Sequence, residues 1–193
     1  MATRQANSVR IIAGEWRSRL VDFPAASGLR PTPDRVRETL FNWLGQDLTG
    51  KRCLDLFAGS GALGFEALSR GAEEVVFVDR SAPIRRAIAA NAARLGARGV
   101  RLIAGDALEF AATTPERFDT VFVDPPYGSD LAEAVLPKLP RLLAADSLVY
   151  VESDRVFSAP QPWQRVRDGR AGAVHYCLIK WGADDATERD AGG

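Results

Sequence analysis

The segment Asp124-Pro125-Pro126-Tyr127 combines the groups needed to hold a planar amine, and it follows an apolar run over 118–123 that predicts a buried strand. An exocyclic base amine is a poor nucleophile, because its lone pair is conjugated into the ring. The Asp124 carboxylate and the Pro125 carbonyl can accept its two N–H bonds and favour a pyramidal nitrogen, and the carboxylate then meets the charge that develops during transfer. Tyr127 offers a stacking face for a base pulled out of its helix, and the two prolines fix the backbone. The motif therefore predicts a site that modifies an amine.

A glycine-rich loop lies upstream of this motif. Gly59-Ser60-Gly61-Ala62-Leu63-Gly64 matches GxGxxG between a predicted strand and a predicted helix. The glycines allow close backbone approach, and the helix N-terminus offers free N–H groups. Asp79, twenty positions after Gly59 at the end of the next strand, can accept hydrogen bonds from ribose hydroxyls. These features predict a nucleotide-like cofactor, but they suit a nicotinamide dinucleotide as well.

Asp55 favours S-adenosylmethionine over a dinucleotide. Its carboxylate would repel a pyrophosphate in the loop, whereas it would attract the ammonium and sulfonium groups of S-adenosylmethionine. A purely structural role as a loop cap is the alternative. Asp106 is placed to receive the adenine amino group, and it also suits the N-cap of a helix beginning at Ala107. The predicted cofactor residues are Asp55, Phe57, Ala58, Gly59, Ser60, Gly61, Asp79, Arg80, Asp106 and Ala107.

The elements that must position these residues alternate between strand and helix. Such alternation, with nearly continuous apolar strands, predicts an α/β fold with a doubly wound, mostly parallel sheet, Rossmann-like and covered on both faces. In such a sheet ligands bind at the carboxyl ends of the strands, so the strands that end in Asp55 and Asp124 are expected to be neighbours. A C-terminal antiparallel hairpin is expected from 164–167 and 174–181. Predicted strands cover 52–57, 74–79, 100–104, 118–124 and 147–153, and predicted helices 62–69, 82–95, 107–112 and 130–143.

A small β-hairpin is predicted at the amino end, with strands over 9–13 and 18–23 and a turn at Gly14-Glu15-Trp16. Thr32-Pro33-Asp34 is typical of a helix start, with Thr32 as the N-cap. The predicted organisation is a β-hairpin extension over 1–31, a catalytic domain over 32–181 and a disordered acidic tail over 182–193.

Composition limits the class of protein. The 193 residues have a formal net charge of zero, which argues against a general polyanion binder. No apolar run approaches the ~20 residues of a membrane span, and no secretory signal begins the chain, so we expect a cytoplasmic protein. Cys53 and Cys177 are far apart and suit small core residues, and we expect no metal site.

Arginine is concentrated near the amino end. Up to residue 37, seven arginines face three acidic residues, an excess of four positive charges. Guanidinium groups suit phosphate, so this stretch favours contact with nucleic acid over an ordinary solvated surface. Arg35 has the alternative of pairing with Glu38. The candidate RNA contacts are Arg10, Arg17, Arg19, Arg30, Arg35 and Arg37.

These motifs resemble class I S-adenosylmethionine-dependent methyltransferases, in the amino-methylating group with a D/N-P-P-Y/F motif. Over Val9 to Trp181 the chain resembles the RsmD-type bacterial 16S rRNA guanine-N2 methyltransferases more closely. The blocks Val9–Gly14, Leu29–Thr32, Asp34–Glu38, Leu40–Leu44 and Leu54–Ala72 carry this resemblance. It implies methylation of guanine 966 in 16S rRNA, on an assembled or assembling small subunit, with Asp124, Pro125, Pro126 and Tyr127 at the catalytic site. We expect a monomer.

Three alternatives remain at this stage. The same amine clamp could act on adenine N6 of DNA or RNA or on a glutamine amide of a protein. The GxGxxG loop leaves a nicotinamide-dependent oxidoreductase open, although the sole histidine, His175, lies in a predicted edge strand and is a poor candidate for the acid. A catalytically silent RNA-binding assembly factor is the third.

Overall fold

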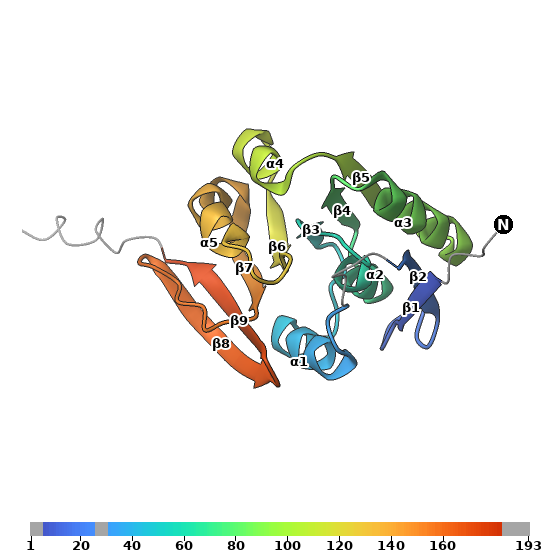
Figure 1. Ribbon diagram of the computed structural model, residues 1–193, viewed down its shortest axis with the longest axis horizontal. Coiled ribbons are helices and arrows are strands. Elements are labelled where there is room, and N and C mark those ends of the chain that lie inside the picture. The colour runs from blue at the N-terminus through green and yellow to red at the C-terminus, as the bar shows by residue number, and fades with distance from the viewer. Residues whose placement is uncertain (1–5, 26–30, 183–193) are drawn as a thin grey trace, which may run out of the picture.

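The computed structural model describes residues 6–25 and 31–182 (Figure 1). Arg30 and the predicted tail beyond Gly182 lie outside these residues. The central sheet has seven strands in the order β5-β4-β3-β6-β7-β9-β8. Its strands are β3 (Arg52–Asp55), β4 (Glu74–Asp79), β5 (Val100–Ala104), β6 (Phe118–Val123), β7 (Leu143–Ser153), β8 (Trp163–Ala171) and β9 (Val174–Trp181). The first five are parallel to one another, and β9 pairs antiparallel with both β7 and β8. The predicted fold class is confirmed.

Helices cover both faces of this sheet (Figure 1). One face carries α1 (Asp34–Leu44), α2 (Ala62–Ser69) and α3 (Ala82–Leu95), and the other carries α4 (Ala107–Thr113), α5 (Leu131–Val135) and the 3-10 helix η1 (Leu136–Leu142). Alternation along each strand sends neighbouring side chains into opposite cores. Cys53 of β3 therefore packs on the α1–α3 side, whereas Leu54 packs on the α4–α5 side. None of the helices in the described ranges is long and apolar enough to cross a membrane.

The segment predicted as one helix over 130–143 is instead the short α5 followed by η1. Pro137 and Pro140 account for the difference, since proline lacks the N–H that an α-helix needs in its interior. β7 begins at Leu143, four residues before the predicted strand, and β8 also extends further than expected, over Trp163–Ala171.

A separate two-stranded antiparallel sheet forms at the amino end from β1 (Ala6–Arg10) and β2 (Leu20–Pro24). We call this pair of strands and the turn between them the N-terminal hairpin. It lies against α2 and α3 (Figure 1). Asn91 of α3 accepts the backbone N–H of Asp22 at 3.0 Å and donates to its carbonyl at 2.7 Å. This exchange between one amide side chain and the backbone fixes the position of β2 on the helix.

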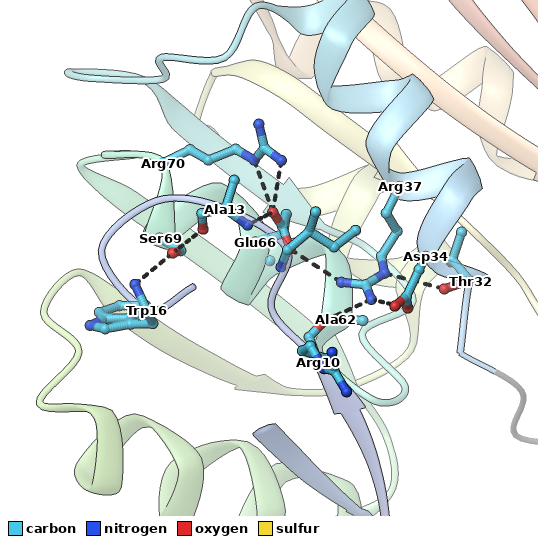
Figure 2. Close-up of polar contacts among 12 residues, drawn as sticks. Arg10, Ala13, Trp16, Thr32, Asp34, Arg37, Ala62, Glu66, Ser69 and Arg70 are labelled. Carbon is cyan, nitrogen blue, oxygen red and sulfur yellow. Dashed lines mark hydrogen bonds and ion pairs between the residues drawn. The ribbon is translucent and has the colours of Figure 1, made fainter. Parts of the chain in front are cut away.

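The carboxylate of Glu66 holds the other side of the hairpin (Figure 2). Glu66 lies on α2 and is fully buried, and it accepts the backbone N–H groups of Ile12 at 2.8 Å and Ala13 at 3.0 Å. The guanidinium groups of Arg37 and Arg70 contact the same carboxylate at 3.2 and 2.9 Å. A buried carboxylate is tolerated when donors of this number and charge surround it. Glu66 thereby joins the hairpin, α1 and α2.

Two predictions about the start of α1 were wrong. Arg37 was expected to face RNA, but its side chain is 0% exposed and also donates to the carbonyls of Arg10 and Thr32. It is a structural residue and is inaccessible to a phosphate. Thr32 does not cap α1, whose N-cap residue is Pro33, and the Thr32 hydroxyl donates elsewhere.

Replacing Glu66 with glutamine is expected to lower the free energy of unfolding by about 3–5 kcal/mol, because Arg37 and Arg70 would remain buried without their counter-charge. Urea denaturation measures this loss. Glu38→Gln, at an exposed position on α1, is the matched control and should change stability by less than about 0.5 kcal/mol. Equal effects of the two substitutions would contradict the role given to Glu66.

Candidate active site

A pocket of about 620 Å³ opens at the carboxyl ends of the parallel strands, and both predicted motifs line it. The chain runs outward from β3 to β4 and β5 and then returns to β6, so β3 and β6 are neighbours at the switch point of the sheet. This is the place where doubly wound folds bind ligands. Of the predicted residues, the lining contains Asp55, Phe57, Ala58, Gly59, Ser60, Asp79, Arg80, Asp106, Ala107, Asp124, Pro125, Pro126 and Tyr127. Gly61 is the one predicted cofactor residue outside this lining.

The glycine loop has the backbone geometry that its sequence predicts. Gly59 and Gly61 have φ values of 49° and 75°, in the left-handed region that side chains disfavour. Gly64 serves packing instead, since a Cβ there would lie 2.2 Å from the Phe77 ring of β4. The loop consequently brings the N-terminus of α2 to the pocket with few side chains in the way.

Asp79 and Asp106 bind backbone N–H groups beside the pocket. The two oxygens of Asp79 accept from Gly59 at 3.1 Å and from Ser81 at 2.7 Å. Asp106 caps α4 by accepting from Leu108 and Glu109, as the N-cap interpretation predicted. A carboxylate oxygen can accept a second hydrogen bond, so each residue keeps acceptor capacity for a ligand.

Asp55 lies at the bottom of the pocket and is almost fully buried. One of its oxygens accepts the backbone N–H of Gly64 at 3.1 Å. Burial raises the pKa of Asp55 to about 8, the Gly64 N–H opposes this shift, and the nearby Asp79 adds to it. A cation placed beside Asp55 would stabilise its charged form, whereas a phosphate would make that form still more costly.

Asp124 follows β6 and faces the same pocket. Pairing of Phe122 with Asp55 on one side and with Tyr150 on the other places Asp124 between β3 and β7. Burial and the neighbouring carboxylates of Glu152 and Asp55 raise the pKa of Asp124 well above its usual range. The Thr32 hydroxyl donates to Asp124 Oδ2 at 3.1 Å and opposes that rise.

Tyr127 forms the outer wall of this side of the pocket, with 43% of its surface exposed. Its hydroxyl donates to Glu152 Oε1 at 2.9 Å, and the hydroxyl of Tyr150 donates to Glu152 Oε2 at 2.8 Å. An aromatic ring that is anchored at its hydroxyl and partly exposed can stack on a planar ligand. Burial raises the pKa of the Glu152 carboxyl as well.

Thr32 and Glu152 were missed as site residues by sequence reasoning. Thr32 was assigned to a helix cap, because threonine before Pro-Asp is typical of one. Glu152 lies near the carboxyl end of β7, the strand next to β6, and its side chain is on the same face of the sheet as that of Tyr150. An acidic residue at the end of a strand beside the Asp124 motif could have been predicted as a site residue. Thr32, Pro31 and Leu131 line the pocket, whereas Glu152 lies behind the lining and contacts Tyr127.

The arginines predicted to contact RNA occupy different places. Arg10, Arg17, Arg19 and Arg35 are exposed. Arg10 lies beside the start of α1 (Figure 2), and Arg35 is three residues after the pocket residue Thr32. Arg17 and Arg19 lie in or beside the hairpin turn, which packs on Ser69 at the far end of α2 through the backbone of Glu15 and Trp16. Of these four exposed arginines, Arg10 is linked to the pocket residue Thr32 through Arg37, and Arg35 is close to Thr32 in the chain.

The fold is that of the Rossmann-like, class I methyltransferases, and the pocket lies where such folds bind ligands. The sequence profile of the family described as Conserved hypothetical protein 95 matches residues 9–180, and the chain belongs to this family, the RsmD-type methyltransferases. It is 40% identical over 190 residues to the ribosomal RNA small subunit methyltransferase D of Escherichia coli K12, covering 96% of each chain. The protein of the same name from Haemophilus influenzae is 40% identical over 180 residues, covering 89% of this chain and 93% of the relative. The solved structure of the Escherichia coli protein yhhF superposes with a TM-score of 0.81 at 41% identity, covering 92% of this chain and 99% of that one.

Replacing Asp55 with asparagine is expected to stabilise the ligand-free protein increasingly as the pH rises from 5 to 8. The raised pKa means that the folded chain keeps Asp55 protonated at low pH but bears a costly buried charge as the pH approaches about 8. The amide oxygen can still accept from Gly64. Calorimetric melting temperatures at pH 5, 6.5 and 8 should therefore diverge, by about 2–4 °C for each kcal/mol gained.

Asp146→Asn is the control for this series, because Asp146 lies at an exposed position of β7 with φ of 57°, a conformation that asparagine also accepts. Its melting temperature should follow the wild type at every pH. A constant difference between Asp55→Asn and the wild type across the range would contradict the raised pKa.

Proposed function

We propose that this chain transfers a methyl group from S-adenosylmethionine to the exocyclic N2 amine of a guanine in 16S rRNA, at the position corresponding to guanine 966, on an assembled or assembling small subunit. The observation that carries this proposal is the placement of Asp124-Pro125-Pro126-Tyr127 and the acidic glycine-loop site in one pocket. The names of the relatives, which are small-subunit rRNA methyltransferases, support the choice of RNA.

The pocket residues fit S-adenosylmethionine. Its cationic part suits Asp55, whose buried carboxyl has no cationic partner among the groups that shift its pKa. Its ribose suits the remaining acceptor capacity of Asp79, and the N-terminus of α2 follows the glycine loop that both residues contact. When bound, S-adenosylmethionine supplies an electrophilic methyl group on a sulfonium. A dinucleotide would bring its pyrophosphate close to Asp55, which is why the oxidoreductase alternative is disfavoured.

The residues of the other half of the pocket would orient the amine. Asp124 and the Pro125 carbonyl accept its two N–H bonds, so that the nitrogen lone pair is released from the ring and directed into the pocket. A carboxylate near the nitrogen stabilises the positive charge that grows there while the N–C bond forms and the methyl–sulfur bond breaks, which leaves a neutral thioether. The nitrogen then loses one proton to water. Tyr127 stacks on the base. Methylation of adenine N6 or of a glutamine amide uses the same groups, so the choice of guanine depends on the family.

Asp124→Ala is expected to reduce methyl transfer to small-subunit rRNA by about 100-fold or more while leaving the affinity for S-adenosylmethionine within about threefold, since Asp124 acts on the amine. Incorporation of labelled methyl groups into rRNA measures the transfer rate, and calorimetric titration measures the affinity for S-adenosylmethionine. Asp130→Ala removes an exposed carboxylate six residues later and is the control. Substantial activity in Asp124→Ala would exclude the amine clamp.

Arg10→Gln is expected to weaken RNA binding and to lower the slope of log affinity against log salt concentration by about 0.7–0.9 for each phosphate that Arg10 neutralises. Arg98→Gln is the matched control, because Arg98 is exposed just before β5 and thus lies at the amino edge of the sheet, opposite the pocket. Filter binding to an rRNA fragment across about 50–200 mM salt gives both slopes. Equal slopes for Arg10→Gln and the wild type would assign Arg10 to the solvated surface.

A further inference from the structure

The carboxyl of Asp124 has two polar neighbours that the proposed reaction does not require. One is the Thr32 hydroxyl, 3.1 Å from Oδ2 and also close to the Glu152 carboxyl. The other is Glu152, whose position on β7 is the next beyond Val151, the residue paired with Val123 of β6. Thr32 is 3% exposed and Glu152 is 1% exposed, and both face the partly buried Asp124 from the protein interior.

We propose that Thr32 and Glu152 are positioning residues of the amine site, which act through Asp124 and Tyr127 and set the pH range over which the chain transfers methyl groups. This inference rests on the proposed function.

Geometry gives the two residues opposite effects on Asp124. The Thr32 hydroxyl is a donor, so it stabilises the ionised carboxylate that binds the amine. Glu152 carries a like charge, so it favours the protonated form, in which Asp124 could accept only weakly from the amine. The other groups that face this cluster are the Asp55 carboxylate from β3, the hydroxyls of Tyr127, Tyr150 and Tyr176, and the Asp154 carboxylate after β7.

Glu152 also fixes the aromatic wall. Its two oxygens accept the hydroxyls of Tyr127 and Tyr150, so the exposed ring of Tyr127 is tied to the buried ring of Tyr150 through one carboxylate. Tyrosine otherwise keeps two free torsions at its side chain, and fixing them before a base arrives reduces the entropy lost on stacking.

Thr32 is itself held in place from the protein interior. Its carbonyl accepts from Arg37 Nε at 3.2 Å, and Arg37 is paired with Glu66. Figure 2 shows Arg37 between Glu66 and the Thr32 carbonyl. These buried contacts hold Thr32 where its hydroxyl reaches the carboxyl of Asp124. The Thr32 hydroxyl contacts one oxygen of Asp124, Oδ2, and leaves the other oxygen for the amine.

The pH dependence of single-turnover methyl transfer to small ribosomal subunits tests this inference. In Glu152→Gln the like charge is gone, and the acidic limb of the rate profile is expected to move down by about one pH unit. In Thr32→Val the donor is gone, and the limb is expected to move up. Thr32→Ser restores the hydroxyl and should keep the wild-type limb, which separates the hydroxyl from a packing effect.

The inference is supported if the acidic limb of the rate profile moves in opposite directions in Glu152→Gln and Thr32→Val. It is overturned if the acidic limb of both variants stays at the pH of the wild-type limb. Should Glu152→Gln fail to fold, as judged by its melting curve, the direction of the Thr32→Val shift decides alone. A wild-type protein that transfers no methyl group to rRNA refutes the proposed function instead, and that outcome is distinct from unshifted limbs in active variants.

Discussion

Three carboxyl groups, the buried Asp55 and Glu152 and the partly buried Asp124, converge at the carboxyl edge of three adjacent strands, and the free-energy cost of that crowding shapes the rest of the structure. Asp55 on β3 pairs with Phe122 of β6, which in turn pairs with Tyr150 of β7. Asp124 and Glu152 lie two positions after these partners. Alternation along the strands therefore directs all three carboxyl groups toward the face covered by α1 and α2. Each has its pKa raised by burial. A fold tolerates such a cluster when function requires it and when the surrounding scaffold is firm.

Glu66 shows how this chain stabilises a buried carboxylate when no ligand is involved. Among the residues that the structure describes, Glu66 receives two backbone N–H groups and two guanidinium groups, whereas Asp55 receives one backbone N–H and Asp124 one hydroxyl. Asp55 and Asp124 therefore keep carboxyl oxygens that can still accept hydrogen bonds from a ligand or pair with a cation. Arg37 contacts both Glu66 and the carbonyl of Thr32. The well-paired Glu66 cluster therefore helps to position Thr32 beside the pocket carboxyl of Asp124.

The sequence was sufficient to predict the sheet, because its strands are apolar runs bounded by helix starts. The bounds of α2, α3, β4 and β5 agree with the predicted ranges. The sequence also predicted that the two motifs lie in one pocket. The GxGxxG loop follows β3 and the Asp124 motif follows β6, so the two must meet wherever β3 and β6 pair. The roles of individual residues in binding and catalysis stay predictions.

Long-range side-chain contacts were beyond the reach of sequence patterns. Arg37 reads as one more basic residue among many, and only the approach of α2 shows that it is neutralised by Glu66, 29 positions away. Thr32 had a sound local interpretation as a helix cap, but a contact 92 positions away took its hydroxyl. The breakdown of the 130–143 helix into α5 and η1 was by contrast predictable, since two prolines interrupt it.

The measurement that tests the central claim most directly uses labelled S-adenosylmethionine, the purified protein, and small ribosomal subunits from cells that lack this modification. The rRNA is digested, and the labelled nucleoside is identified by its mass and retention and mapped to its position. The predicted result is N2-methylguanosine at a single site corresponding to guanine 966. Label in another base, or in DNA or protein with none in rRNA, would contradict the assignment.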